Sequence, residues 1–141
     1  MKGRIGIRAV FVWICMLIFF AGGVGSQRTV QAKTYKKGFT YQKISSEMKS
    51  QMTGKSYPKT GAGLSFSELR EVSVRYYNFK GKVKSGTLIV NRKIALKTAK
   101  IFYQLYRIRY PIQRIQPVDV YDADDRRSME ANNTSAFNYR R

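Results

Sequence analysis

The first 32 residues limit what the rest of this 141-residue chain can fold into. A basic start is followed by an almost unbroken apolar run over residues 9–20, and then by the small-residue motif Val30-Gln31-Ala32. This order is typical of a secretory signal peptide that is cleaved after Ala32. The run is shorter than the roughly 20 residues that span a bilayer, and a retained membrane anchor is the alternative. We therefore expect a protein that is secreted or held in the cell envelope, with residues 33–141 forming one small domain.

Cysteine and histidine usage restricts the chemistry of this domain. The only cysteine, Cys15, lies in the expected signal peptide, and the chain has no histidine. The domain therefore has no disulfide and no thiol nucleophile, and it depends on its apolar core for stability. Ser-His-Asp and Cys-His catalytic arrangements are excluded for the same reason. The pair Ser46-x-x-Lys49 lacks the partner motifs of a Ser-Lys enzyme.

The charge of the domain indicates the kind of partner it favours. Four of the chain's 27 basic residues precede residue 33, so the remaining 23, with eight acidic residues, give residues 33–141 a net charge of +15. Such a charge favours polyanions through long-range attraction and counterion release. For an exported protein the accessible polyanions are anionic wall polymers such as teichoic acid, and anionic lipid head groups. We expect no nucleic acid partner, and membrane contact only through an uncleaved signal segment.

Hydrophobic periodicity divides the first half of the domain into a leader, a helix and a loop. Residues 33–40 are basic and turn-prone, and we predict a flexible leader there. Ile44, Met48 and Met52 are four residues apart, which places them on one side of a short helix. The glycines and proline of residues 53–63 predict a loop.

A β-hairpin and a long helix follow. Alternating apolar residues predict strands over residues 69–79 and 83–90, with Gly86 as a weak point or bulge in the second strand. A helix over residues 92–109 is predicted to be capped by Asn91. We expect its apolar stripe to pack on the sheet; the stripe consists of Ile94, Thr98, Ile101, Phe102, Leu105 and Ile108.

The last part of the chain has weaker patterns. We predict a short edge strand over residues 112–120, a polar irregular segment over 122–134 and a final strand over 135–140. The order of elements predicts an α+β fold, namely a small antiparallel sheet with one long helix packed on a face.

Four aspartates lie close together in the sequence: Asp119, Asp122, Asp124 and Asp125. A calcium loop needs a series of acids at alternate positions followed by a glycine; the spacing of this cluster differs, and no glycine lies between Asp119 and Arg141. An irregular loop is also a poor support for a catalytic carboxylate pair. We predict a solvated turn with Asx hydrogen bonds and no metal site.

The C-terminal third carries a resemblance to a known family. The segment Tyr110-Pro111-Ile112, the segment around Pro117 to Tyr121, and above all residues 132–140 (Asn-Asn-Thr-Ser-Ala-Phe-Asn-Tyr-Arg) carry it. Over about residues 70–141 the chain resembles the secreted zinc D-alanyl-D-alanine carboxypeptidase family, which trims the peptides of bacterial peptidoglycan. The resemblance implies that Arg140 is the catalytic electrostatic group, which stabilises an oxyanion or binds a carboxylate. It also implies that Ser135 and Asn138 bind the peptide substrate.

The chain departs from this family at its metal centre. The family's zinc ligands, two histidines and an aspartate, lie downstream of the matching segment, and a catalytic zinc site needs three protein ligands. We therefore expect residues 1–32 to be the signal peptide, 33–63 the basic leader and short helix, and 64–141 the N-terminal part of a carboxypeptidase-like domain. Such an incomplete domain would hold no cofactor, although the full-length family binds zinc, and would be inactive as a peptidase. The alternatives are a cationic protein that binds teichoic acid or peptidoglycan, and a chain whose missing histidines come from a second chain.

Overall fold

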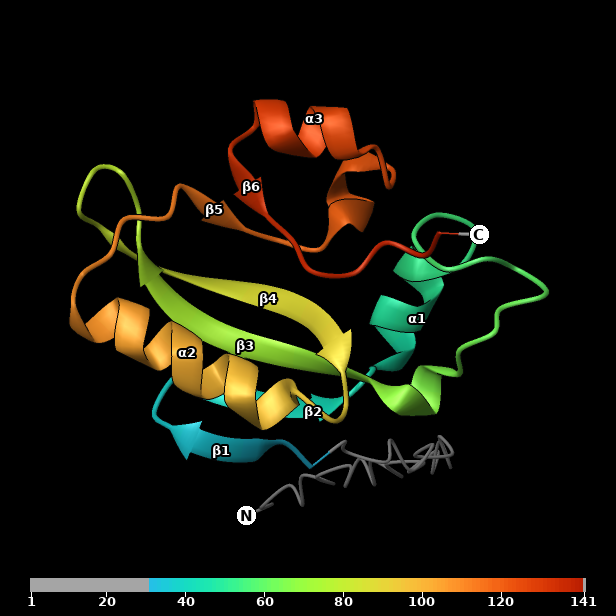
Figure 1. Ribbon diagram of the computed structural model, residues 1–141, viewed down its shortest axis with the longest axis horizontal. Helices are drawn as coiled ribbons and strands as arrows, with labels where there is room; N and C mark the ends of the chain where they lie inside the picture. The colour runs from blue at the N-terminus through green and yellow to red at the C-terminus, as the bar shows by residue number, and fades with distance from the viewer. Residues whose placement is uncertain (1–30, 141) are drawn as a thin grey trace, which may run out of the picture.

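An antiparallel sheet forms the centre of the protein in the computed structural model, which describes residues 31–140 (Figure 1). The expected signal peptide therefore lies almost wholly outside the described residues. In chain order the elements are β1 (Lys33–Lys36), β2 (Phe39–Lys43), α1 (Ser46–Met52), η1 (Phe66–Glu68), β3 (Leu69–Tyr77), β4 (Val83–Asn91), α2 (Ala95–Arg107), β5 (Arg114–Ile115), η2 (Val118–Tyr121), α3 (Asp125–Glu130) and β6 (Asn133–Thr134).

The hairpin of β3 and β4 contains the two longest strands of the sheet. It confirms the two strands that were predicted from alternating apolar residues. The two strands pair without interruption from Leu69 opposite Asn91 to Tyr77 opposite Val83. Asn78 closes the turn, because its side-chain oxygen accepts hydrogen bonds from the backbone N–H groups of Lys80 and Lys82, at 3.0 and 2.9 Å. The full sheet has the order β1-β2-β3-β4 with every pair antiparallel, so the predicted α+β class is confirmed.

The predicted flexible leader is wrong, because residues 33–43 form the first two strands. Gly38 has a φ of +83°, which an L side chain rarely adopts, and this lets the chain reverse between β1 and β2. The aromatic rings of Tyr35 and Phe39 then pack edge-on against Tyr103 of α2, with ring centroids 5.7 and 5.3 Å away. Alternating aromatic residues on either side of Gly38 outweigh the basic composition that predicted disorder.

Helix α2 forms where it was predicted, but it starts later and presents a different face to the sheet. Asn91 does not cap it; its side-chain oxygen accepts from the N–H of Lys93, at 2.9 Å, and the helix starts after Ile94. The residues that pack on the sheet are small or aromatic: Ala95, Ala99, Phe102, Tyr103 and Tyr106. Ile101, which we expected in the core, is 49% exposed. The two alanines let the helix axis lie close to the strands, and the aromatic rings fill the space beside them.

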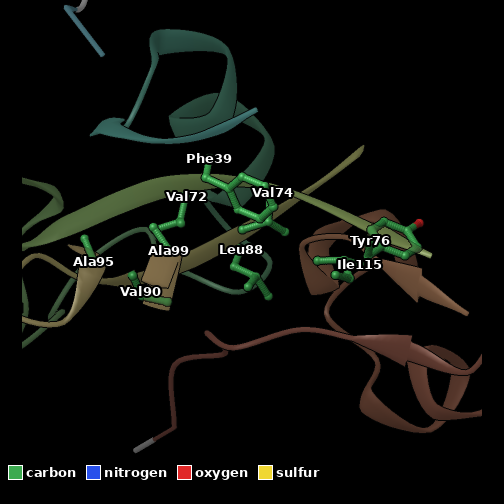
Figure 2. Packing of buried hydrophobic residues seen from close by; sticks show 9 residues of the cluster. All are labelled: Phe39, Val72, Val74, Tyr76, Leu88, Val90, Ala95, Ala99 and Ile115. Atoms are coloured by element: carbon green, nitrogen blue, oxygen red, sulfur yellow. The ribbon is translucent and has the colours of Figure 1, made fainter. Parts of the chain in front are cut away.

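Two apolar clusters lie on opposite faces of the sheet, because successive strand residues point to opposite sides. On one face, the strands and α2 form the larger cluster with Ile115 of β5 (Figure 2). On the other face, Leu69 and Ile89 pack with Ile44 and with Met52 of α1. The predicted short helix forms, but it begins at Ser46, so Ile44 precedes it. Ile44 and Met52 are buried in this cluster, and Met48 packs against its edge.

The C-terminal segment, residues 112–140, runs across the β4 side of the sheet (Figure 1). The predicted edge strand shrinks to β5, which pairs in parallel with β6. The segment predicted to be irregular contains α3, and the final strand predicted over residues 135–140 is wrong, since that stretch has no regular structure. Gly86 is not a bulge: a Cβ there would lie 2.5 Å from Ile115 Cβ, so the glycine is required by close packing.

Candidate anion-binding site

The residues that the family resemblance singled out lie near the C-terminal end of the described chain. Arg140 forms an ion pair with Asp125. The side-chain amide of Asn138 donates to Asp125 Oδ1 at 2.8 Å and to the carbonyl of Ala123 at 3.1 Å. Ser135 is exposed and takes no part in these contacts. The structure thus brings Arg140 and Asn138 together on one carboxylate and leaves Ser135 apart.

The rest of this stretch fastens it to the loop that follows α1. The backbone N–H of Tyr139 donates to the carbonyl of Ser56 at 2.9 Å, and its hydroxyl accepts from the N–H of Gly63 at 3.1 Å. Phe137 packs against the apolar cluster that contains Met52. The contacts of residues 137–140 therefore join two distant parts of the chain.

The four aspartates all accept hydrogen bonds or form ion pairs with other parts of the chain, and they do so in three different ways. Asp119 is buried and accepts from the N–H and the hydroxyl of Ser56, at 3.1 and 2.9 Å. Asp122 forms ion pairs with Lys55 at 2.8 Å and Arg127 at 3.1 Å. The hydrogen bond from Lys55, and to a smaller extent that from Arg127, lowers the pKa of this exposed carboxyl. Asp124 caps α3 by accepting from the N–H of Arg127 at 3.1 Å. The predicted solvated turn is therefore wrong in part, because Asp119 is buried and Asp125–Glu130 form a helix.

This part of the protein does not fit a zinc centre. Within residues 31–140 no three His, Cys, Asp or Glu side chains come together as a metal-binding group. Zinc prefers imidazole and thiolate ligands, and the chain has no histidine and only Cys15. No zinc-dependent step is therefore assigned to these residues.

A pocket of about 540 Å³ opens on the side of the sheet where α2 begins. Cations from four separate segments surround it, and together they are named the basic pocket: Lys33, Lys43, Arg70, Arg92 and Lys93. Tyr41, Gln42, Leu96 and Gln31 complete its lining.

The sheet register explains how these cations meet. Lys43 of β2 lies directly opposite Arg70 of β3, and Lys33 of β1 lies opposite Tyr41. Arg92 and Lys93 follow β4 and lead into α2. Like charges directly opposite each other in a sheet are unfavourable. The arrangement therefore concentrates positive charge at a cost that a bound anion would relieve.

The electrostatics of the basic pocket are one-sided. Among the described residues no carboxylate lines it, and the ion pairs found in residues 31–140 involve other cations, namely Lys55, Arg126, Arg127 and Arg140. Arg70 is held in place by hydrogen bonds from its guanidinium to the carbonyls of Ser67 and Leu69, at 2.9 and 2.6 Å. The first turn of α2 carries no acidic side chain, so the partial positive charge of the helix start adds to the field.

The side chains of this lining have the hydrogen-bond donors that an anion requires. Lysine and arginine supply up to three and five N–H donors each, which suits phosphate oxygens. Sequence reasoning did not find the pocket, since its residues are scattered from position 31 to position 96. One signal was present: between Glu71 and Asp119 the chain has eleven basic residues and no acidic one.

Comparison with known proteins adds no assignment. No family model matches the chain, and neither a curated protein nor a solved structure matches it. The resemblance to zinc carboxypeptidases therefore stays a prediction. Within residues 31–140 there is also no helix of the length and hydrophobicity that a membrane crossing requires.

Proposed function

We propose that the protein is an exported, cationic cell-envelope protein that binds a phosphate-bearing anionic polymer of the cell wall, such as teichoic acid. One observation carries this proposal: five cations from four segments converge on one pocket, which no described carboxylate lines. A repeating polyanion can place one phosphate in the pocket and others along the basic surface around it. The expected export of the chain makes wall polymers the accessible partners.

A pair of charge-matched variants tests the role of the pocket. The first variant, Lys43→Gln/Arg92→Gln/Lys93→Gln, removes three cations from the basic pocket. The control, Lys55→Gln/Arg126→Gln/Arg127→Gln, removes the same charge from cations that are already ion-paired. Co-sedimentation of each purified protein with cell walls, at several salt concentrations, gives its affinity.

The two variants should separate clearly. The pocket variant should bind at least about tenfold more weakly at low salt and show a shallower salt dependence, because fewer counterions are released. The affinity of the control for cell walls should fall by about threefold or less, because the cations it removes are neutralised by neighbouring acids. Equal losses would mean that total charge, and not the basic pocket, determines binding. Binding that ignores salt would refute the electrostatic proposal altogether.

A second proposal follows from the resemblance, in which the chain binds peptidoglycan peptide as a peptidase relative that is inactive in this form. It is supported by the convergence of Arg140 and Asn138 on one carboxylate, since a peptide carboxylate could take the place of Asp125. The purified chain should release no D-alanine from wall peptides when zinc is added. If this proposal holds, Arg140→Ala should weaken peptide binding and the pocket variant should not. Zinc-dependent turnover that a chelator abolishes would contradict the predicted inactivity.

A further inference from the structure

The outer side of α2 carries apolar side chains that the fold does not use. Ile94, Ile101 and Ile108 are 49%, 49% and 71% exposed, and together they are named the isoleucine row. They recur every seven residues, so they lie nearly in line along the helix. At 1.5 Å per residue the row is about 21 Å long, from just before the first turn of α2 to just after the last.

This row is separate from the face that packs on the sheet. Ala95 and Ala99 point into the core, and rotation by 100° per residue places the isoleucines roughly a third of a turn away from them. Thr98 and Leu105 lie between the isoleucines and are half-buried. Single exposed apolar residues are common on protein surfaces, but a row of three on one helix is a feature of interaction surfaces.

The charges beside the row indicate what can cover it. Lys93, Lys97, Lys100 and Arg107 lie on or next to α2, and no acidic residue occurs between Glu71 and Asp119. A second copy of the chain would bring the same cations face to face, which disfavours it. An anionic lipid bilayer offers both an apolar layer for isoleucine and phosphate groups for lysine and arginine.

We propose that the outer side of α2 lies on the surface of an anionic lipid bilayer, with the isoleucine row at the boundary between head groups and acyl chains. The helix stays packed on the sheet by its other face (Figure 1). This contact goes beyond the membrane contact expected through an uncleaved signal segment. It rests on the apolar row and does not depend on wall-polymer binding by the basic pocket.

Site-specific fluorescence tests this contact in the full chain, whether or not the N-terminal segment also holds it to lipid. The single tryptophan, Trp13, is first replaced by phenylalanine. Ile101→Trp then places a probe in the row, and Val120→Trp places a control at a 55% exposed apolar position on η2. Both proteins are mixed with vesicles of equal parts phosphatidylglycerol and phosphatidylcholine that carry brominated acyl chains, and with vesicles of phosphatidylcholine alone.

The Ile101→Trp protein should show a blue shift and quenching several-fold larger than the Val120→Trp control, and only with phosphatidylglycerol. Ile108→Trp serves as a second probe if circular dichroism shows that Ile101→Trp disturbs the fold. Equal quenching of probe and control, or no quenching of either, would overturn the proposal. So would a dimer in size-exclusion chromatography that Ile101→Ser disperses, because a second copy would then cover the row.

Discussion

The sheet with α2 and the C-terminal segment of residues 112–140 differ in how much regular secondary structure and how many polar contacts hold them. In the first region long strands and a helix bury a continuous apolar cluster (Figure 2). In the second, each strand has two residues; Ile115 packs into that same cluster and Val118 is buried, and side-chain hydrogen bonds join the polar residues around them. Asn133, for example, bonds to the backbone N–H and C=O of Gln116 at 2.9 and 3.0 Å, and to the hydroxyl of Ser128 at 3.0 Å.

The two regions also treat their charges differently. Five of the chain's eight acidic residues lie between Asp119 and Glu130. All the ion pairs seen in residues 31–140 use acids of this short stretch, which neutralise Lys55, Arg126, Arg127 and Arg140. None of these ion pairs uses a cation of the sheet or of α2. Net charge alone therefore does not locate a binding surface, because only its unneutralised part attracts a polyanion.

The largest expected effect on stability comes from a substitution that disrupts the packing of β5 on β4. Gly86→Val should lower the free energy of unfolding by about 3 kcal/mol or more, because its side chain would overlap Ile115 of β5, including the backbone oxygen 2.5 Å from the Cβ position. Urea unfolding measures this loss. Gly63→Ala is the matched control, since its Cβ would meet only the Tyr139 hydroxyl at 3.7 Å. If both variants unfold at the wild-type urea concentration, β5 does not pack on β4 as described.

A smaller loss of folding stability should follow when the hydrogen bonds between Asp119 and Ser56 are removed. Asp119→Ala removes the acceptor of two buried hydrogen bonds from Ser56, and should cost about 1–3 kcal/mol because the N–H of Ser56 is left without a partner. Ser56→Ala removes only the hydroxyl bond and should cost less. Chemical denaturation of both variants gives the order. An Asp119→Ala protein as stable as wild type would show that apolar packing, and not this bond, holds the segment.

The next prediction concerns stability without a ligand. The pocket variant Lys43→Gln/Arg92→Gln/Lys93→Gln should be as stable as wild type, or more stable by about 0.5 kcal/mol, because mutual repulsion falls. The control Lys55→Gln/Arg126→Gln/Arg127→Gln should be slightly less stable than wild type, because it breaks three surface ion pairs. Thermal unfolding at low salt compares the two. The opposite order would mean that the pocket cations have partners within the protein.

The parts of the fold that were predicted correctly are those with a long, regular pattern. The strands β3 and β4 follow from alternating residues, and α2 follows from its 3.6-residue period. The packed face of α2 was mispredicted because large apolar residues outweigh alanine in such a pattern. The sheet instead takes Ala95 and Ala99, since the rings of Phe39 and Tyr103 already fill the neighbouring space.

The basic pocket could not be predicted from spacing. Its cations come from four segments that meet only after β1 and β2 pair with β3, and β1 and the start of β2 were predicted to be a flexible leader. Arg140 and Asn138 were singled out by resemblance, and the structure shows only that both contact Asp125. The positive charge of the chain could be counted from the sequence. Which cations are neutralised by ion pairs could be seen only in the folded structure.

The smallest predicted effect is a pH dependence that belongs to the C-terminal segment alone. Lys55 and Arg127 lower the pKa of Asp122 in the folded chain below its unfolded value of about 3.9. The ionised carboxylate therefore stabilises the fold above that value, and the contribution is lost as the pH falls through the lowered pKa. Asp122→Asn should have a slightly lower urea midpoint than wild type at pH 7, and the difference should vanish near pH 2. High salt should also shrink it, because the carboxylate is exposed and its ion pairs are screened. A difference that persists at low pH would mean that Asp122 acts through its hydrogen bonds as a neutral group, and that the segment is held without charge.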